Sequence, residues 1–161
     1  MKNRIRSIAS VTFLLFCPKA FAEELFKATA LTKPGEFTKG IEGPACDKAG
    51  NVFAVNFKEQ GTIGRVTPDG KGEIFLTLPE GSTGNGIRFD KKGNMFIADY
   101  PKHNVMRVDA KTKKLTVLAH EPRMNQPNDL AIDAKGNLYA SDPSWDKDTA
   151  QLWRISKKGM V

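Results

Sequence analysis

The stretch QPNDLAIDAKGNLYASDP, residues 126–143, decides the fold because related phrases occur twice earlier in the chain. EGPACDKAGNVFAVN begins at Glu42, and GNGIRFDKKGNMFIAD begins at Gly84. All three phrases contain the motif D-x-x-G-N, at intervals of 43 residues. The motifs start at Asp47, Asp90 and Asp133. Each phrase has an apolar strand pattern on either side of the motif. The sequence therefore predicts three copies of one hairpin.

The D-x-x-G-N motif has the chemistry of a tight turn. The Asp side chain can accept hydrogen bonds from the backbone ahead of it, and the Gly provides the positive φ that closes a hairpin. A second strand pair follows in each copy, starting at Thr62, Asn104 and Gln151. A repeat of about 43 residues with four short antiparallel strands is typical of a β-propeller blade. The alternative is a meander in a β-sandwich or barrel, but the constant register favours the propeller.

We therefore expect an all-β fold with about three blades of an incomplete six-bladed propeller over residues 23–161. The expected parts are an orphan outer strand 25–33, blade one 41–78, blade two 84–120 and an incomplete blade three 127–161. Three blades cannot close a ring, which needs roughly four to eight. The chain is therefore expected to be the N-terminal half of a longer propeller. The alternative is a homodimer in which two copies exchange the outer strand and close one ring.

Residues 1–22 have the layout of a secretory signal peptide. A basic start, MKNRIR, precedes a short apolar run and the small-x-small pattern that ends at Ala22. We expect cleavage after Ala22 and a periplasmic or secreted protein that has no membrane span. Cleavage removes four bases and lowers the formal net charge from +7 to +3. No basic block remains that would favour nucleic-acid binding. Cys46 is then the one cysteine, and we expect it to be a small buried residue.

Two sets of polar residues recur in the repeat at equivalent positions. The first set is Glu42, Asn85 and Asn128, and the second is Asn56, Asp99 and Asp142. A hairpin brings both positions to the end opposite the D-x-x-G-N turn. If the first strand of each blade lines the axis, both sets gather at one mouth of the central channel. Carboxylate and amide oxygens suit a hard divalent cation, and Ca²⁺ is the favoured one. For the second set, the alternative is a polar cap on each inner strand.

Two phrases resemble those of one known family. EGPACDKAGNVF is similar to the opening blade of the SMP-30/gluconolactonase/LRE-like family, and QPNDLAIDAKGNLYASDP is similar to its third-blade phrase. The resemblance implies a six-bladed propeller that binds a divalent metal, often calcium. It implies that Glu42 is a metal ligand and that Asn128 is a second ligand or a substrate contact. Asn85 and Asp142 would line the same mouth, to which substrate binds.

The resemblance also leaves parts of the site open. Gln126 is a candidate substrate contact because some members carry an Arg there. The family's fourth-blade Asn and its fifth-blade Asp, the expected general base, have no counterpart before Val161, so no catalytic residue is assigned. Trp145 and Trp153 are expected to pack between blades rather than to bind sugar.

The function implied by the resemblance is that of an exported, metal-dependent, lactonase-like hydrolase for a small lactone or sugar-like substrate. In such an enzyme the metal polarises the lactone carbonyl and a carboxylate activates water. We expect this chain, as an N-terminal half, to be inactive on its own. The alternative is a non-catalytic exported propeller of the NHL-like kind, which binds a partner at the same mouth or through its loops.

Overall fold

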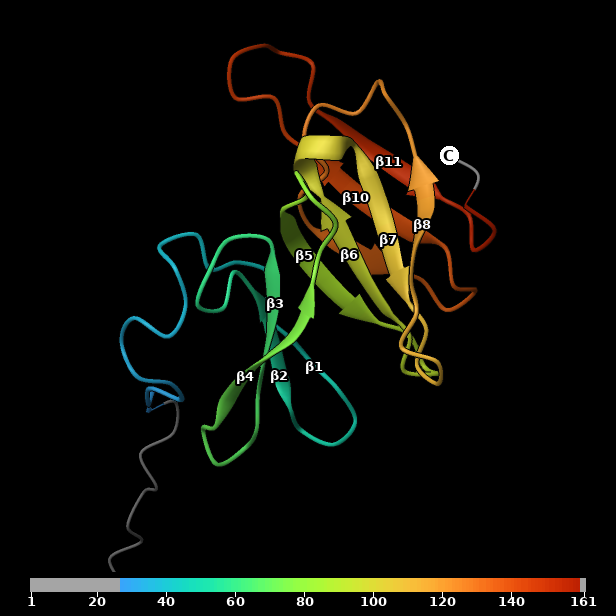
Figure 1. The fold of residues 1–161 in the computed structure, drawn as a ribbon. Helices are drawn as coiled ribbons and strands as arrows, with labels where there is room; N and C mark the ends of the chain where they lie inside the picture. The colour runs from blue at the N-terminus through green and yellow to red at the C-terminus, as the bar shows by residue number, and fades with distance from the viewer. Residues whose placement is uncertain (1–26, 160–161) are drawn as a thin grey trace, which may run out of the picture.

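The structure is a computed structural model, and it describes residues 27–159. The expected signal peptide, residues 1–22, lies outside the described residues. Three separate antiparallel sheets form the fold, and Figure 1 shows them as successive blades. Within residues 27–159 no helix has the length and apolarity needed to cross a bilayer.

Each sheet follows the chain in order, as a propeller blade does. Blade one contains β1 (Ala45–Cys46), β2 (Val52–Val55), β3 (Thr62–Val66) and β4 (Gly72–Thr77). Blade two contains β5 (Gly84–Phe89), β6 (Met95–Asp99), β7 (Asn104–Val108) and β8 (Leu115–His120), with a short 3-10 turn, η1 (Tyr100–Lys102), between β6 and β7. Blade three contains β9 (Leu130–Ile132), β10 (Leu138–Asp142) and β11 (Gln151–Ile155). The predicted all-β fold with about three blades is confirmed, and a single sandwich or barrel meander is excluded.

The D-x-x-G-N turns have the predicted chemistry in all three blades. In the first, Oδ1 of Asp47 accepts hydrogen bonds from the backbone N–H groups of Ala49 and Asn51, both at 2.9 Å. Its Oδ2 accepts the side-chain amide of Asn51 at 2.9 Å. The same three bonds occur in the turns of blades two and three. Gly50 has φ 83°, the left-handed conformation that a glycine adopts at low cost.

These hydrogen bonds have an electrostatic consequence at the third turn. The side-chain amide of Asn137, followed by the backbone amides of the turn, lowers the pKa of Asp133 from 3.8 to about 2. Donors that point at a carboxylate stabilise its charged form. The turn is therefore most stable when Asp133 is ionised.

The hydrophobic core lies between blades rather than within them. Side chains alternate along a strand, so the two faces of a blade contact different neighbours. In β6, Met95 and Ile97 pack toward blade one, whereas Phe96 and Ala98 pack toward blade three. Every residue of β6 is buried for this reason. Burial of both faces explains why β2 and β6, the second strands of blades one and two, are nearly continuous apolar runs.

Two expectations about the N-terminal part were wrong. No strand forms over residues 27–33, the described part of the orphan strand expected at 25–33. A strand there would need an outer partner. The described segment that follows it makes an isolated bridge between Phe37 and Phe57 instead. Cys46 is exposed, not buried. Its neighbour Ala45 packs on the core, so alternation along β1 turns Cys46 to the opposite face.

Candidate functional site

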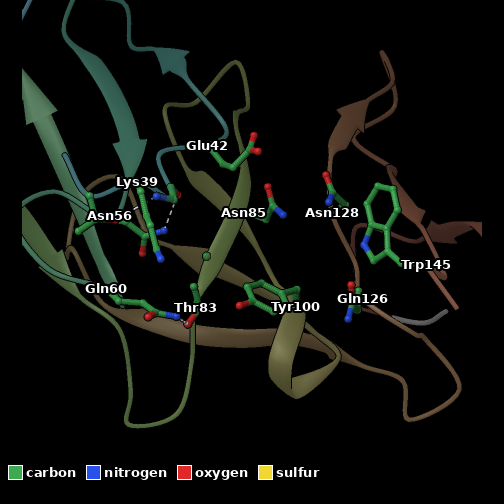
Figure 2. A pocket seen from close by; sticks show the side chains of 13 residues that line it. Lys39, Glu42, Asn56, Gln60, Thr83, Asn85, Tyr100, Gln126, Asn128 and Trp145 are labelled. Atoms are coloured by element: carbon green, nitrogen blue, oxygen red, sulfur yellow. Dashed lines mark hydrogen bonds between the residues drawn. The ribbon is translucent and has the colours of Figure 1, made fainter.

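A cavity of about 570 Å³ lies at the end of the blades opposite the D-x-x-G-N turns. Four of the five residues that the family resemblance assigned to the site line it: Glu42, Asn85, Gln126 and Asn128. Figure 2 shows Glu42, Asn85 and Asn128 side by side along one wall, each from a different blade. The other lining residues are Thr38, Lys39, Gly40, Asn56, Gln60, Thr83, Gly84, Tyr100 and Trp145.

Two glycines allow the inner strands to approach closely enough to form this wall. Gly43 and Gly86 follow the polar residues of blades one and two and are 43 residues apart. A Cβ on Gly43 would lie 1.9 Å from the backbone oxygen of Asn85. A Cβ on Gly86 would lie 2.6 Å from the backbone oxygen of Asn128, which accepts a hydrogen bond from the Gly86 N–H at 2.8 Å. The glycines thus fix the spacing of the three polar side chains.

The second polar set, Asn56, Asp99 and Asp142, forms hydrogen bonds with the segment that precedes the inner strand of each blade. Asp99 is fully buried, and its carboxylate accepts hydrogen bonds from the Ser82 hydroxyl at 3.0 Å and the Thr83 N–H at 3.2 Å. Asn56 donates from its side-chain amide to the backbone oxygen of Gly40 at 2.7 Å. The two residues whose backbone is bound in this way, Gly40 and Thr83, lie two positions before Glu42 and Asn85 respectively.

Asp142 likewise binds the segment before the inner strand of blade three, and it accepts more hydrogen bonds than Asp99 or Asn56 does. It is 1 % exposed, and its Oδ1 accepts the Gln126 N–H at 2.6 Å. Its Oδ2 accepts the N–H and the side-chain amide of Asn125 and the indole N–H of Trp153. Asp142 is not among the residues that line the cavity. The geometry gives this carboxylate a structural role beneath the site. Asp142 also lines a smaller pocket with Asn128 and Trp145, and its contact with substrate stays a prediction.

The wall side chains are free to bind a ligand. Within residues 27–159, the side chains of Glu42, Asn85 and Asn128 form no hydrogen bond and no ion pair. Glu42 is exposed and is the one carboxylate on the described lining, and Lys39 is the one ammonium group. Oxygen donors without a protein partner at a shared opening are what a hard cation or a polyhydroxy ligand requires.

Trp145 is a site residue that reasoning from sequence missed. It was expected to pack between blades, but it is 80 % exposed and stands at the edge of the cavity (Figure 2). Its loop, residues 143–150, leaves β10 at the mouth end and is longer than the corresponding loop in blade two. The length of this loop, which contains an aromatic residue, is the signal that could have found it. Trp153, by contrast, packs against the core between blades two and three, as predicted.

Comparison with known proteins gives the class and then the family. Three successive four-stranded or three-stranded sheets with a shared axial mouth define a partial β-propeller. The sequence model of the SMP-30/Gluconolactonase/LRE-like region matches residues 41–161. The chain belongs to the SMP-30/gluconolactonase/LRE-like family. No curated protein sequence gives a significant match.

Solved structures share the fold at low sequence identity. A gluconolactonase from Xanthomonas campestris has 18 % identity and a TM-score of 0.61, over 74 % of this chain and 45 % of its own. A calcium-binding regucalcin from Agrobacterium tumefaciens has 18 % identity and a TM-score of 0.57, over 73 % and 40 %. A chain of the nidogen/laminin complex has 22 % identity and a TM-score of 0.62, over 75 % and 46 %. This chain therefore spans less than half the length of each of these three structures.

Proposed function

We propose that the chain belongs to an exported, metal-dependent, lactonase-like hydrolase and supplies the first part of its metal and substrate site. The observation that carries the proposal is the convergence of Glu42, Asn85 and Asn128 on one cavity. Membership of a family named for gluconolactonase supports the reaction class. The calcium-binding regucalcin among the similar structures supports the divalent cation.

The donor set fits a hard divalent cation in part. Glu42 would supply a carboxylate oxygen, and Asn85 and Asn128 would supply amide oxygens, all free of protein partners. Ca²⁺ takes about six to eight oxygen ligands, so these three residues fill at most half of the positions. No group of three or more His, Cys, Asp or Glu side chains capable of holding a metal occurs in residues 27–159. We infer that this chain by itself holds Ca²⁺ weakly.

The chemistry follows from the position of the side chains. A bound divalent cation would act as a Lewis acid toward a lactone carbonyl. Gln126 and Tyr100 offer hydrogen-bonding groups on the lining, and the indole face of Trp145 offers a platform for the apolar face of a sugar-like ring. Lys39 would attract the carboxylate of a hydrolysed lactone. Glu42 is the one carboxylate on the described lining and is assigned to the cation, which leaves no general base there. We therefore expect no turnover by this chain alone.

Calcium titration by calorimetry tests the metal site. We expect weak, saturable binding to the purified chain, which is lost in Glu42→Gln and unchanged in Glu80→Gln. Glu80 is an exposed carboxylate away from the cavity, so it controls for the loss of one negative charge. Equal binding by both variants would place the cation elsewhere and remove the support for this proposal.

Export is a separate part of the proposal. It rests on the signal-like composition of residues 1–22. Expression in a bacterial host with separation of periplasm and cytoplasm tests it. We expect a periplasmic product whose mass corresponds to cleavage after Ala22. An uncleaved cytoplasmic chain would contradict export.

A second candidate function is that of a non-catalytic binding scaffold. The observation that favours it is the single carboxylate on the described lining, which is sparse for hydrolysis. The likeness to a chain of the nidogen/laminin complex shows that this fold also occurs in a protein assembly. A chain that binds sugar-like ligands equally well with and without Ca²⁺ would favour the scaffold over the hydrolase.

A further inference from the structure

A second large groove lies between blades two and three, at the D-x-x-G-N end and away from the candidate site. Its volume is about 650 Å³, whereas the corresponding groove between blades one and two has about 300 Å³. The two grooves are built by the same repeat, so their difference must come from particular side chains. Cavities of about 300–1,000 Å³ are the size in which proteins bind small molecules.

The repeat shows what enlarges the second groove. In the first groove three aromatic side chains pack together: Phe53, Phe75 and Phe89. Their ring centroids are 5.0 and 5.1 Å apart, with edge-to-face geometry. The residues 43 positions later line the second groove: Phe96, Leu118 and Ile132. Two of the three rings are thus replaced by smaller aliphatic side chains, which leaves an apolar trough where the rings would be.

The border of this trough carries an excess of positive charge. Four lysines line it: Lys91, Lys92, Lys135 and Lys157. None of them forms an ion pair with another residue of the described chain. Two aspartates also line the groove, Asp90 and Asp133, but their carboxylates already accept the hydrogen bonds of their own turns. The two aspartates keep their negative charges, but the four lysines outnumber them, so the groove has a net positive charge toward a ligand.

We propose that this groove binds an amphipathic monoanion, a medium-chain or aromatic carboxylate. Its apolar body would lie on Phe96, Leu118 and Ile132, in the space that the two rings occupy in the first groove. Its carboxylate would lie among the lysine ammonium groups at the border. The combination of apolar trough and unpaired cations selects such an anion over neutral or cationic molecules of the same length.

Calorimetric titration of the full chain with decanoate, below its micelle concentration, tests the proposal. We expect saturable binding of one decanoate per chain that weakens with added salt, because the lysines are exposed to solvent. Decyltrimethylammonium, a cation with the same alkyl length, should show no saturable binding. Absence of decanoate binding, or equal binding of both probes, would overturn the proposal.

Three variants locate the binding site. Leu118→Phe/Ile132→Phe places in the second groove the two rings that fill the first groove. It should weaken decanoate binding at least tenfold, which corresponds to about 1.4 kcal/mol. Lys92→Gln/Lys135→Gln should weaken it similarly and reduce its salt dependence. Lys111→Gln/Lys113→Gln removes the same charge at the first groove, which Lys113 lines, and should leave the affinity unchanged.

If the double Phe variant does not fold, the lysine variants still test the proposal. They change exposed side chains only and should therefore fold. Equal affinities for the two lysine pairs would overturn the proposal. Glu42→Gln should bind decanoate with unchanged affinity, because Glu42 lies outside this groove. The experiment can therefore refute decanoate binding here without refuting the metal site, and the reverse.

Discussion

Replacement of Asp142 by alanine should be among the most destabilising single changes in blade three. The carboxylate is 1 % exposed and accepts four hydrogen bonds, at 2.6, 2.8, 2.9 and 3.1 Å, from Gln126, Asn125 and Trp153. Each buried donor left without an acceptor costs about 1–3 kcal/mol. Gln126 is exposed and Asn125 is half-buried, so water can partly replace the lost acceptor, which reduces the sum. We expect a loss of about 3–5 kcal/mol in the free energy of unfolding.

Urea unfolding of the variants measures this loss by linear extrapolation. Oδ2 accepts three of the four bonds, so Asp142→Asn can keep them by placing its amide oxygen there. This variant should lose only the bond from Gln126 and cost about 1–3 kcal/mol. Asp146→Ala, at an exposed position of the following loop, is the control and should stay within about 0.5 kcal/mol. A cost below about 1 kcal/mol for Asp142→Ala would refute the structural role of this carboxylate.

Three further predictions concern the wall, the turn and the reaction. Gly86→Ala should cost about 1–3 kcal/mol in urea unfolding because its Cβ meets backbone at 2.6 Å, whereas Gly40→Ala should be nearly neutral. The pKa of Asp133 is lower in the folded chain (about 2) than its ordinary 3.8, so its contribution to stability is full above about pH 4 and lost toward pH 2. Asp133→Asn should therefore flatten stability over that range, and an unchanged acid profile would contradict the pKa. The chain should not hydrolyse glucono-δ-lactone above the uncatalysed rate, and EDTA-sensitive turnover would refute this expectation.

The repeat made the fold predictable. A D-x-x-G-N motif at a spacing of 43 residues fixes the turn, the strand pairing and the order of each blade at once. Because the same positions recur, the sequence also placed Glu42, Asn85 and Asn128 at one opening, where the structure has them. Local hydrogen bonding and periodic alternation determine all of this, and both are visible in a sequence.

The remaining features depend on contacts that the repeat does not encode. Asp142 shares its position with Asn56 and Asp99. The sequence left open whether these residues cap the inner strands or bind a ligand, and the structure shows that all three hydrogen-bond to backbone at the mouth end. Trp145 lies on a loop specific to blade three, so no second copy indicates where it goes. Cys46 is exposed because β1 is a short edge strand whose alternate face has no cover among the described residues. The homodimer that the sequence offered as an alternative is untested, and light scattering can test it.

Paramagnetic NMR tests most directly whether Glu42, Asn85 and Asn128 form one cation site. Mn²⁺, which prefers the same oxygen ligands, broadens the signals of nearby nuclei in a ¹⁵N-labelled chain. We predict that substoichiometric Mn²⁺ broadens the side-chain amide signals of Asn85 and Asn128 first, and that Glu42→Gln abolishes the effect. Broadening confined to other residues, or equal broadening in Glu42→Gln, would contradict a shared site at the axial mouth.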